Sequence, residues 1–225
     1  MERGVYEAII SYSKQRAERF VHDFYHVNRV LNYALIIAET ENGADLDVVV
    51  AAALLHDIAR AEEADDPNVC HAERGGVMAA EFLAGIGFDP RKTARAAECI
   101  AAHRFKKGPE PATIEAKILF DADKLDQTGA AGLARLMLDG ALTGEPLYLL
   151  DPAGMPAPGL PSEGRSFLRL YNRKLRGLQS KFYTAKAVEI AENQLATVSA
   201  YIKTLRRELN ENYANGNRLL KRMIT

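Results

Sequence analysis

The sequence predicts an all-α fold, and two observations carry that prediction. Apolar residues recur at the three- and four-residue spacing of a helix along most of the 225 residues, and no stretch alternates apolar and polar residues between turn signals as a strand does. A chain of this length with 48% apolar residues can bury a large core without disulfides or a structural metal. A bound metal is therefore expected to serve function rather than folding.

Periodicity and end signals place the helices in chain order. Helices are expected at residues 5–20, 25–39, 46–62, 72–85, 90–103, 113–127, 130–139, 164–179 and 184–212. Gly43 and Gly87 suit the left-handed conformation that ends a helix, and Pro90 suits the first turn of the next helix. The 46–62 segment is apolar on nearly every face until it reaches His56 and Asp57, so it is expected to be buried.

One composition shift divides the chain. Residues 151–164 contain four Pro and three Gly, so this segment is expected to be a long loop that acts as a flap or carries a homodimer contact. We expect a helical core over residues 1–150, the loop over 151–164, and C-terminal helices over 165–225 that pack on the core to give one structural domain.

Charge and cysteine content exclude several classes of protein. The 29 Lys and Arg nearly balance the 30 Asp and Glu, so stable nucleic-acid binding is not expected. Cys70 and Cys99 have no zinc-site spacing, which predicts free thiols. The longest strongly apolar run, Val48 to Leu55, is too short to cross a membrane, and no apolar signal segment follows Met1, so we expect a cytoplasmic protein with no membrane partner.

The adjacent His56 and Asp57 need compensation if their helix is buried. A buried carboxylate without a partner is costly, so it is paired, protonated or bound to a cation. A core hydrogen bond, or exposure at the helix end, is one interpretation of the pair. A metal site is the other.

Other apolar stripes also end on residues of the kind that bind metals. His26 continues a stripe with Val30 and Ile37, His71 precedes one with Met78 and Phe82, and His103 ends one with Ala96 and Ile100. His22 lies one turn before His26. Asp121 and Asp123 flank the core position Ala122, and periodicity alone does not choose between these two carboxylates.

The order His26, then His56-Asp57, then an Asp within the sequence DADKLD resembles the H…HD…D signature of the HD-domain metal-dependent phosphohydrolase superfamily. The matching segments are HDFYHVNRV, AAALLHDIAR, TIEAKILFDADKLDQTGAAGLAR and NRKLRGLQSKFYTAKAVEIA. Together they are similar to the bacterial subgroup of small stand-alone HD hydrolases over nearly the whole chain. The resemblance implies an HD-domain helical bundle with a C-terminal helical extension.

The resemblance also implies a ligand set. His26, His56, Asp57 and Asp123 would hold the metal, with Asp121 in a supporting hydrogen-bonding role. Two imidazoles and two carboxylates suit a divalent transition metal such as Mn²⁺, Fe²⁺, Ni²⁺ or Zn²⁺ and suit Mg²⁺ less well. The opposing interpretation is a polar core whose hydrogen bonds are satisfied without metal.

His71 and His103 admit three interpretations. Some members of the superfamily use further histidines to hold a second ion, with the doublet Asp, here Asp57, bridging the two ions. Alternatively they bind phosphate or shuttle protons around a single ion, or are ordinary core histidines.

A position shortly after the HD doublet departs from better-understood relatives. Nucleotidases and alarmone hydrolases of the superfamily carry an acid where this chain has Arg60, which cannot act as a general base. We expect Arg60 to contact phosphate, with Lys124, Arg104 and Lys106 as weaker candidates. Glu62 or Glu63 is a further candidate for a carboxylate near the site.

The resemblance implies a metal-dependent phosphohydrolase that acts on a nucleotide or another phosphorylated small molecule. In this mechanism a metal-activated water attacks phosphorus, and Asp57, His71, His103 and Arg60 are the residues expected to take part in catalysis. Two alternatives from other classes are a regulatory module that senses a metal or nucleotide without turnover, and a di-iron HD oxygenase. No phosphate-binding loop and no G-x-S-x-G elbow is present in the sequence.

Overall fold

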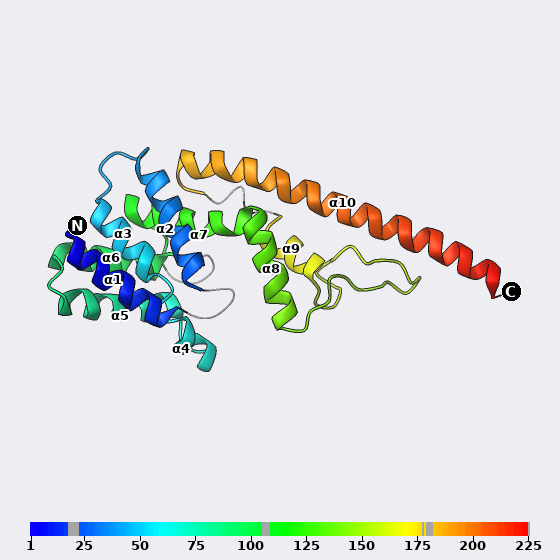
Figure 1. Cartoon of the computed structure of the whole chain (residues 1–225), viewed down its shortest axis with the longest axis horizontal. Helices are drawn as coiled ribbons and strands as arrows, with labels where there is room; N and C mark the ends of the chain where they lie inside the picture. The colour runs from blue at the N-terminus through cyan, green and yellow to red at the C-terminus, as the bar shows by residue number, and fades with distance from the viewer. Residues whose placement is uncertain (18–22, 105–108, 177, 179–181, 225) are drawn as a thin grey trace. The chain divides into compact units, whose positions relative to one another are not determined.

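The computed structural model describes residues 1–17, 23–104, 109–176, 178 and 182–224. Helices account for the regular structure of these residues, and no β-strand occurs among them beyond one isolated bridge between Leu150 and Pro156. The predicted all-α fold is confirmed. The helices are α1 (Arg3–Arg16), α2 (Phe24–Ala38), α3 (Leu46–Leu55), α4 (Arg60–Asp65), α5 (His71–Gly85), α6 (Pro90–Ala102), α7 (Ile114–Thr128), α8 (Ala130–Leu142), α9 (Phe167–Lys174) and α10 (Ala185–Met223) (Figure 1).

The chain forms two compact units. The first comprises Met1–Asp126 with Phe182–Glu189, and the second comprises Gln127–Lys181 with Ile190–Thr225. The division therefore falls inside α7 and α10 rather than at the Pro- and Gly-rich loop.

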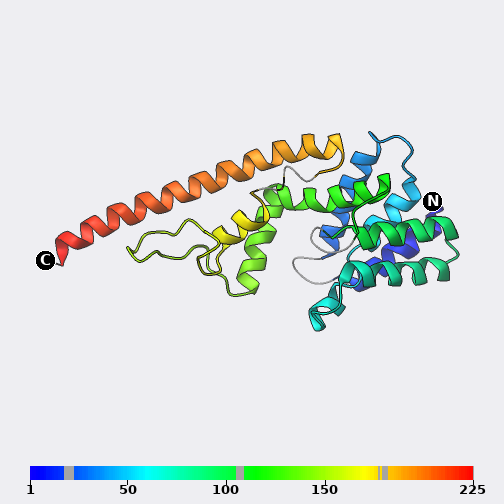
Figure 2. The ribbon, with the colours of Figure 1, turned by 180° about the vertical axis from the view of Figure 1, so that it is seen from behind.

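The first unit is built around α3. This helix contacts α1, α2 and α6, while α5 and α6 lie side by side (Figures 1 and 2). Leu54 and Leu55 of α3 are fully buried, as are Ile118 and Leu125 of α7. The continuous run of Val, Ala and Leu predicts a buried helix, and Val48, Val49 and residues 51–55 of α3 are buried.

Local sequence signals set the helix ends of the first unit. Gly43 and Gly87 have φ of +81° and +73°, as expected for residues that end a helix. Asp45 and Asp89 accept hydrogen bonds from the first backbone N–H groups of α3 and α6, and Pro90 opens α6.

The prediction of one continuous helix over residues 46–62 is wrong. α3 ends at Leu55, residues 56–59 form turns, and α4 begins at Arg60. His56 Nδ1 donates to the Ala53 carbonyl at 2.8 Å, and this is the carbonyl that Asp57 N–H would use in a continuous helix. The side chain of the HD doublet thus replaces a helical hydrogen bond, and the chain turns.

The second unit contains α8, α9, the 151–164 loop and most of α10. No helix occurs in the loop, as predicted, and α9 lies against α8 (Figure 2). α9 begins at Phe167 rather than at residue 164, because Ser166 caps its start by accepting from Arg169 N–H. It ends at Lys174, and residues 177 and 179 of the predicted 164–179 helix lie outside the described residues. α10 continues to Met223 rather than ending near residue 212.

Ala191, Leu195, Val198 and Ile202 are buried at helical spacing along α10, which indicates a packing role for this face. No helix in the described part of the chain combines the length and the apolar character needed to cross a bilayer. Cys70 and Cys99 are both free thiols.

Candidate metal centre

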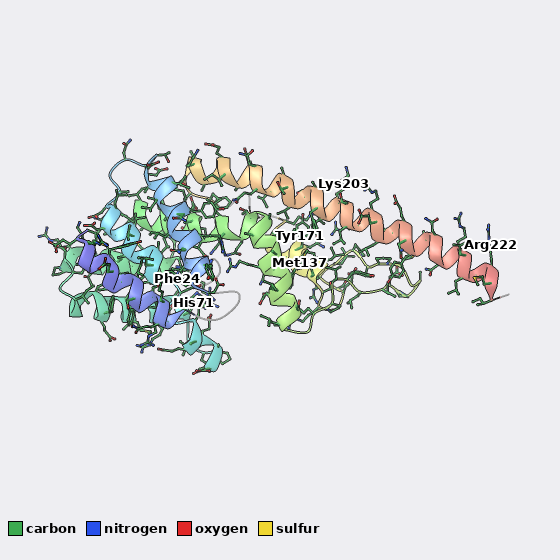
Figure 3. All side chains as sticks on the ribbon, in the orientation of Figure 1. Phe24, His71, Met137, Tyr171, Lys203 and Arg222 are labelled. Carbon is green, nitrogen blue, oxygen red and sulfur yellow. The ribbon has the colours of Figure 1, made fainter. Side chains whose placement is uncertain are left out.

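Five different segments of the first unit deliver the site. His26 lies in the first turn of α2, where the Asp23 cap accepts its backbone N–H at 2.9 Å. His56 and Asp57 lie in the turn after α3, and His71 is the first residue of α5, where Figure 3 labels it. His103 follows the last residue of α6, and Asp123 lies on α7. All six side chains are buried.

Three of these residues form a first group of converging ligand atoms, namely His26, His56 and Asp123. The two imidazole Nε2 atoms are 3.3 Å apart, and His26 Nε2 lies 3.6 Å from Asp123 Oδ1. Asp57 Oδ2 is 3.5 Å from the Nε2 atom of each of the two histidines. The four residues of the H…HD…D signature thus meet around one point.

Asp57, His71 and His103 form a second group. Asp57 Oδ1 lies 3.8 Å from His71 Nε2 and 3.6 Å from His103 Nε2. Asp57 therefore faces the first group with one carboxylate oxygen and the second group with the other.

Every one of the four histidines has its Nδ1 occupied outside the cluster. Backbone carbonyls three residues earlier accept from His56 and from His103, at 2.8 and 2.6 Å. Carboxylates contact the Nδ1 atoms of the other two histidines. Asp126 pairs with His26 Nδ1 at 2.7 Å, and Glu63 pairs with His71 Nδ1 at 2.7 Å. Because a carbonyl or an ionised carboxylate only accepts, each neutral ring carries its proton on Nδ1 and turns the Nε2 lone pair inward.

This arrangement fits a cation. His71 Nε2 and His103 Nε2 are buried and have no hydrogen-bond partner among the described residues. Ligands on one ion with bonds of about 2.1 Å lie about 3.0–3.5 Å apart, and the observed 3.3 Å between His26 Nε2 and His56 Nε2 falls in that range. Several lone pairs that face one another in a buried pocket repel unless a positive charge lies between them.

The electrostatics of the protein alone agree with this geometry. Burial disfavours a charged His56 ring, but the Asp57 and Asp123 carboxylates outweigh burial and raise its pKa. Burial and the Arg60 guanidinium lower the pKa of His71 to about 3, and burial lowers that of His103. Although burial opposes it, Lys124 and His56 hold the pKa of Asp123 well below its usual range. The lowered pKa values thus favour a neutral His71, a neutral His103 and an ionised Asp123, which are the protonation states in which these side chains bind metals. The raised pKa of His56 shows that Asp57 and Asp123 attract positive charge to this pocket, which a bound cation would supply.

Each carboxylate of the site has a cationic partner. Arg60 Nε donates to Asp57 Oδ1 at 2.8 Å, and Lys124 pairs with Asp123. The other two pairs are Arg29 with Asp126, at 2.6 Å, and Arg104 with Glu63, at 2.7 Å. These four carboxylates and four cations balance, so a bound divalent ion would make the pocket positive and favourable for an anion.

Sequence reasoning gave no role to Asp126 or Arg29 and named Glu63 only as an alternative to Glu62. Position could have indicated the first two, because Asp126 lies three residues after Asp123 and Arg29 three after His26, on the same helix faces. Glu62 instead pairs with Arg74 at 2.7 Å on the surface.

The remaining candidates lie in different surroundings. Asp121 points away from the cluster and accepts from Tyr183 N–H, Thr184 N–H and Thr184 Oγ1, at distances of 2.7–3.0 Å. Lys124 is buried and also donates to the His103 carbonyl, whereas the Arg60 and Arg104 side chains are 21% and 28% exposed. His22 and Lys106 lie outside the described residues.

The fold and this cluster define the class of protein. Residues 23–128 match the model of the HD domain family, a segment that contains all six residues of the cluster. Residues 23–128 are therefore an HD domain, and the predicted resemblance to the HD-domain superfamily is confirmed.

Relatives of similar length share the fold. The chain is 29% identical over 192 residues to the uncharacterized protein YpgQ of Bacillus subtilis. The matched segment covers 84% of each chain. The crystal structure of B. subtilis YpgQ in complex with ADP matches 91% of this chain and 97% of that chain with a TM-score of 0.72 at 27% identity.

Two further solved structures carry the name of the superfamily. An HD-superfamily hydrolase from Bacillus thuringiensis matches 93% of this chain and 99% of its own with a TM-score of 0.71 at 26% identity. A predicted HD superfamily hydrolase from an uncultured Thermotogales bacterium matches 92% and 91% with a TM-score of 0.61 at 28% identity. The chain thus has the fold of HD-superfamily hydrolases.

Proposed function

We propose that this protein is a metal-dependent phosphohydrolase that acts on a nucleotide or another phosphorylated small molecule. The observation that carries the proposal is the buried convergence of four imidazole Nε2 atoms on the two oxygens of Asp57, with Asp123 beside them. The ADP bound to the related YpgQ supports a nucleotide as the substrate.

The proposed metal ligands are His26, His56, Asp57 and Asp123, and His71 and His103 would complete a second site. A bound Mn²⁺, Fe²⁺, Ni²⁺ or Zn²⁺ ion, or less favourably Mg²⁺, would supply a Lewis acid for the phosphate and a water of lowered pKa as the nucleophile.

Residues of the chain would supply phosphate binding. The Arg60 and Arg104 guanidinium groups are partly exposed at the edge of the cluster, and a planar guanidinium can donate to two phosphate oxygens at once. Lys124 would act differently, because its ammonium group is already shared between Asp123 and the His103 carbonyl. We infer that Lys124 keeps Asp123 ionised and oriented.

The test is product release by the purified full chain with each added metal. Nucleoside mono-, di- and triphosphates and simple phosphate mono- and diesters are incubated with the protein, and products are separated by chromatography. We expect Asp57→Ala to lower both metal content and turnover, turnover by at least about 100-fold, because Asp57 faces both groups. Glu62→Gln, which changes a neighbouring surface carboxylate, should behave like the unmodified chain.

Three outcomes would contradict the proposal. A folded Asp57→Ala variant with full metal content and activity would show that Asp57 is not part of the metal centre. Tight nucleotide binding without product release under any metal would instead indicate a sensor module. Oxygen consumption on substrate addition by anaerobically prepared, iron-loaded protein would indicate an oxygenase.

A further inference from the structure

Glu63 joins the second ligand group to two arginines. Its Oε2 accepts from His71 Nδ1 at 2.7 Å and from Arg60 at 3.2 Å, and its Oε1 pairs with Arg104 at 2.7 Å. The carboxylate lies on α4, the short helix that exists because the chain turns directly after the HD doublet. Glu63 on α4 thereby lies within hydrogen-bonding distance of His71, its partner eight residues later at the start of α5.

The contact with Glu63 determines what His71 offers to the pocket. A carboxylate that accepts from Nδ1 keeps the proton on that nitrogen, which leaves Nε2 as a lone pair aimed inward. His71 Nε2 is buried, has no hydrogen-bond partner among the described residues and lies 3.8 Å from Asp57 Oδ1. His103 Nε2 shares this condition. A buried pair of lone pairs beside a carboxylate oxygen suits a cation and does not suit a phosphate oxygen.

Two features distinguish Glu63 from an incidental surface carboxylate. Arg60 and Arg104 hold both of its oxygens, so the group that orients His71 is itself fixed. The same construction occurs in the first group, where Asp126 accepts from His26 Nδ1 and is held by Arg29 Nε. Each ligand group therefore contains one histidine oriented by a carboxylate and one oriented by a backbone carbonyl.

We propose that Glu63 is the positioning residue of a second divalent-cation site formed by Asp57, His71 and His103. The two sites share Asp57, one through Oδ2 and the other through Oδ1. The second site has the smaller negative charge, because Asp57 is its only carboxylate ligand and Arg60 binds the same oxygen. It therefore binds its ion more weakly and fills second. This inference rests on the metal-dependent function proposed above.

The experiment is a Mn²⁺ titration of the full chain without substrate, and binding is monitored by calorimetry and by electron paramagnetic resonance. We expect the unmodified chain to bind two ions of unequal affinity and to show the spectrum of coupled Mn²⁺ ions at saturation. Glu63→Gln should weaken the second ion by about 10- to 100-fold, leave the first unchanged and remove the coupled spectrum at matched Mn²⁺ concentration.

Two variants serve as matched controls. Asp126→Asn changes the equivalent carboxylate behind His26, so it should weaken the first ion instead of the second. Glu62→Gln changes the adjacent residue, whose carboxylate pairs with Arg74 on the surface, and should leave both affinities unchanged. Circular dichroism verifies that each variant is folded. If Glu63→Gln does not fold, His71→Asn, which removes the ligand atom itself, is measured for the same loss.

Either of two results overturns the inference. One is a single ion per unmodified chain, and the other is a folded Glu63→Gln or His71→Asn variant that binds two ions as tightly as the unmodified chain. Because the titration contains no substrate, these results are separate from those of the turnover assay. If the chain binds two ions but releases no product from any substrate, the proposed function is contradicted and the second cation site is supported.

Discussion

Residues that differ by a few positions in sequence have different roles in this site. Asp121 and Asp123 flank the same buried alanine on α7, yet Asp123 lies with His26 and His56 while Asp121 accepts three donors from residues 183 and 184. Burial raises the pKa of Asp121 despite these donors, whereas Lys124 and the histidines lower that of Asp123 against the effect of burial. Two carboxylates of one helix turn thus have opposite electrostatic surroundings.

This difference gives a prediction at the scale of single residues. Asp123→Asn should lose the first ion, because a neutral amide replaces a carboxylate ligand that the pocket keeps ionised. Asp121→Asn should retain the ion, because its oxygen can still accept from Tyr183 and Thr184. Elemental analysis of both variants after dialysis against Mn²⁺ measures the outcome, and equal metal content in the two would refute the assignment.

At the scale of secondary-structure elements, two of the ligand histidines lie at helix ends. His56 and His103 each follow the last residue of a helix, and each donates Nδ1–H to the carbonyl three residues earlier. The last carbonyls of a helix have no donor within the helix. The His56 imidazole donates to the Ala53 carbonyl, and the His103 imidazole donates to the Ile100 carbonyl together with the His103 backbone N–H, which leaves Nε2 of each ring for the cluster. Two helix ends, one of α3 and one of α6, thereby aim ligands at one pocket.

The contact between α5 and α6 holds two of these ligands in place. Gly76 of α5 packs so closely that a Cβ at its position would lie 2.9 Å from the Ala97 carbonyl oxygen of α6, whereas a Cβ at Gly85 would meet nothing within 4 Å. Backbone cannot yield as a flexible side chain does. Separation of these helices would also separate His71, at the start of α5, from His103, at the end of α6.

Gly76→Ala and Gly85→Ala therefore form a matched pair on one helix. Gly76→Ala should destabilise the protein by about 1–3 kcal/mol through overpacking. Gly85→Ala should be neutral or stabilising by up to about 1 kcal/mol, because alanine is the better helix former. Urea unfolding curves of the two variants measure the difference, and equal stabilities would show that α5 and α6 adjust freely.

At the scale of the whole molecule, the first unit does not depend on metal for its core. Leu54, Leu55, Ile118 and Leu119 are fully buried or nearly so, and none of them belongs to the ligand cluster. Burial of apolar surface supplies the main driving force for folding, so the helices should form without an ion.

Removal of metal should consequently lower stability without unfolding the chain. An ion at about 100 times its dissociation constant adds about 2.7 kcal/mol, so chelation should lower the melting temperature by about 5–10 °C while the helical circular dichroism spectrum at 25 °C is kept. Thermal scans with EDTA and with Mn²⁺ measure the shift. Loss of helix on chelation would make the metal structural and contradict the prediction.

The sequence by itself was sufficient for the all-α class, the helix ends near Gly43 and Gly87, the start of α6 at Pro90 and the buried character of α3, because each depends on neighbours along the chain. Apolar stripes that end on ligand-type residues indicated the four histidines and Asp57, because such a residue is directed toward the core. Periodicity did not separate Asp123 from Asp121, and the resemblance to the HD-domain superfamily selected Asp123. The sequence did not predict the break after Leu55, because a side-chain hydrogen bond from His56 rather than a helix breaker causes it.

Only the tertiary structure decided which residues meet. Periodicity gives the face on which a side chain lies but not its partner on another helix, so the two-sided position of Asp57 and the contacts of Glu63 and Asp126 with histidines 8 and 100 residues away were not readable from the chain. The same holds for the two compact units, whose boundary falls inside α7 and α10, where the sequence has no linker. Pairing across space is set by the packing of whole helices, which depends on every side chain between them.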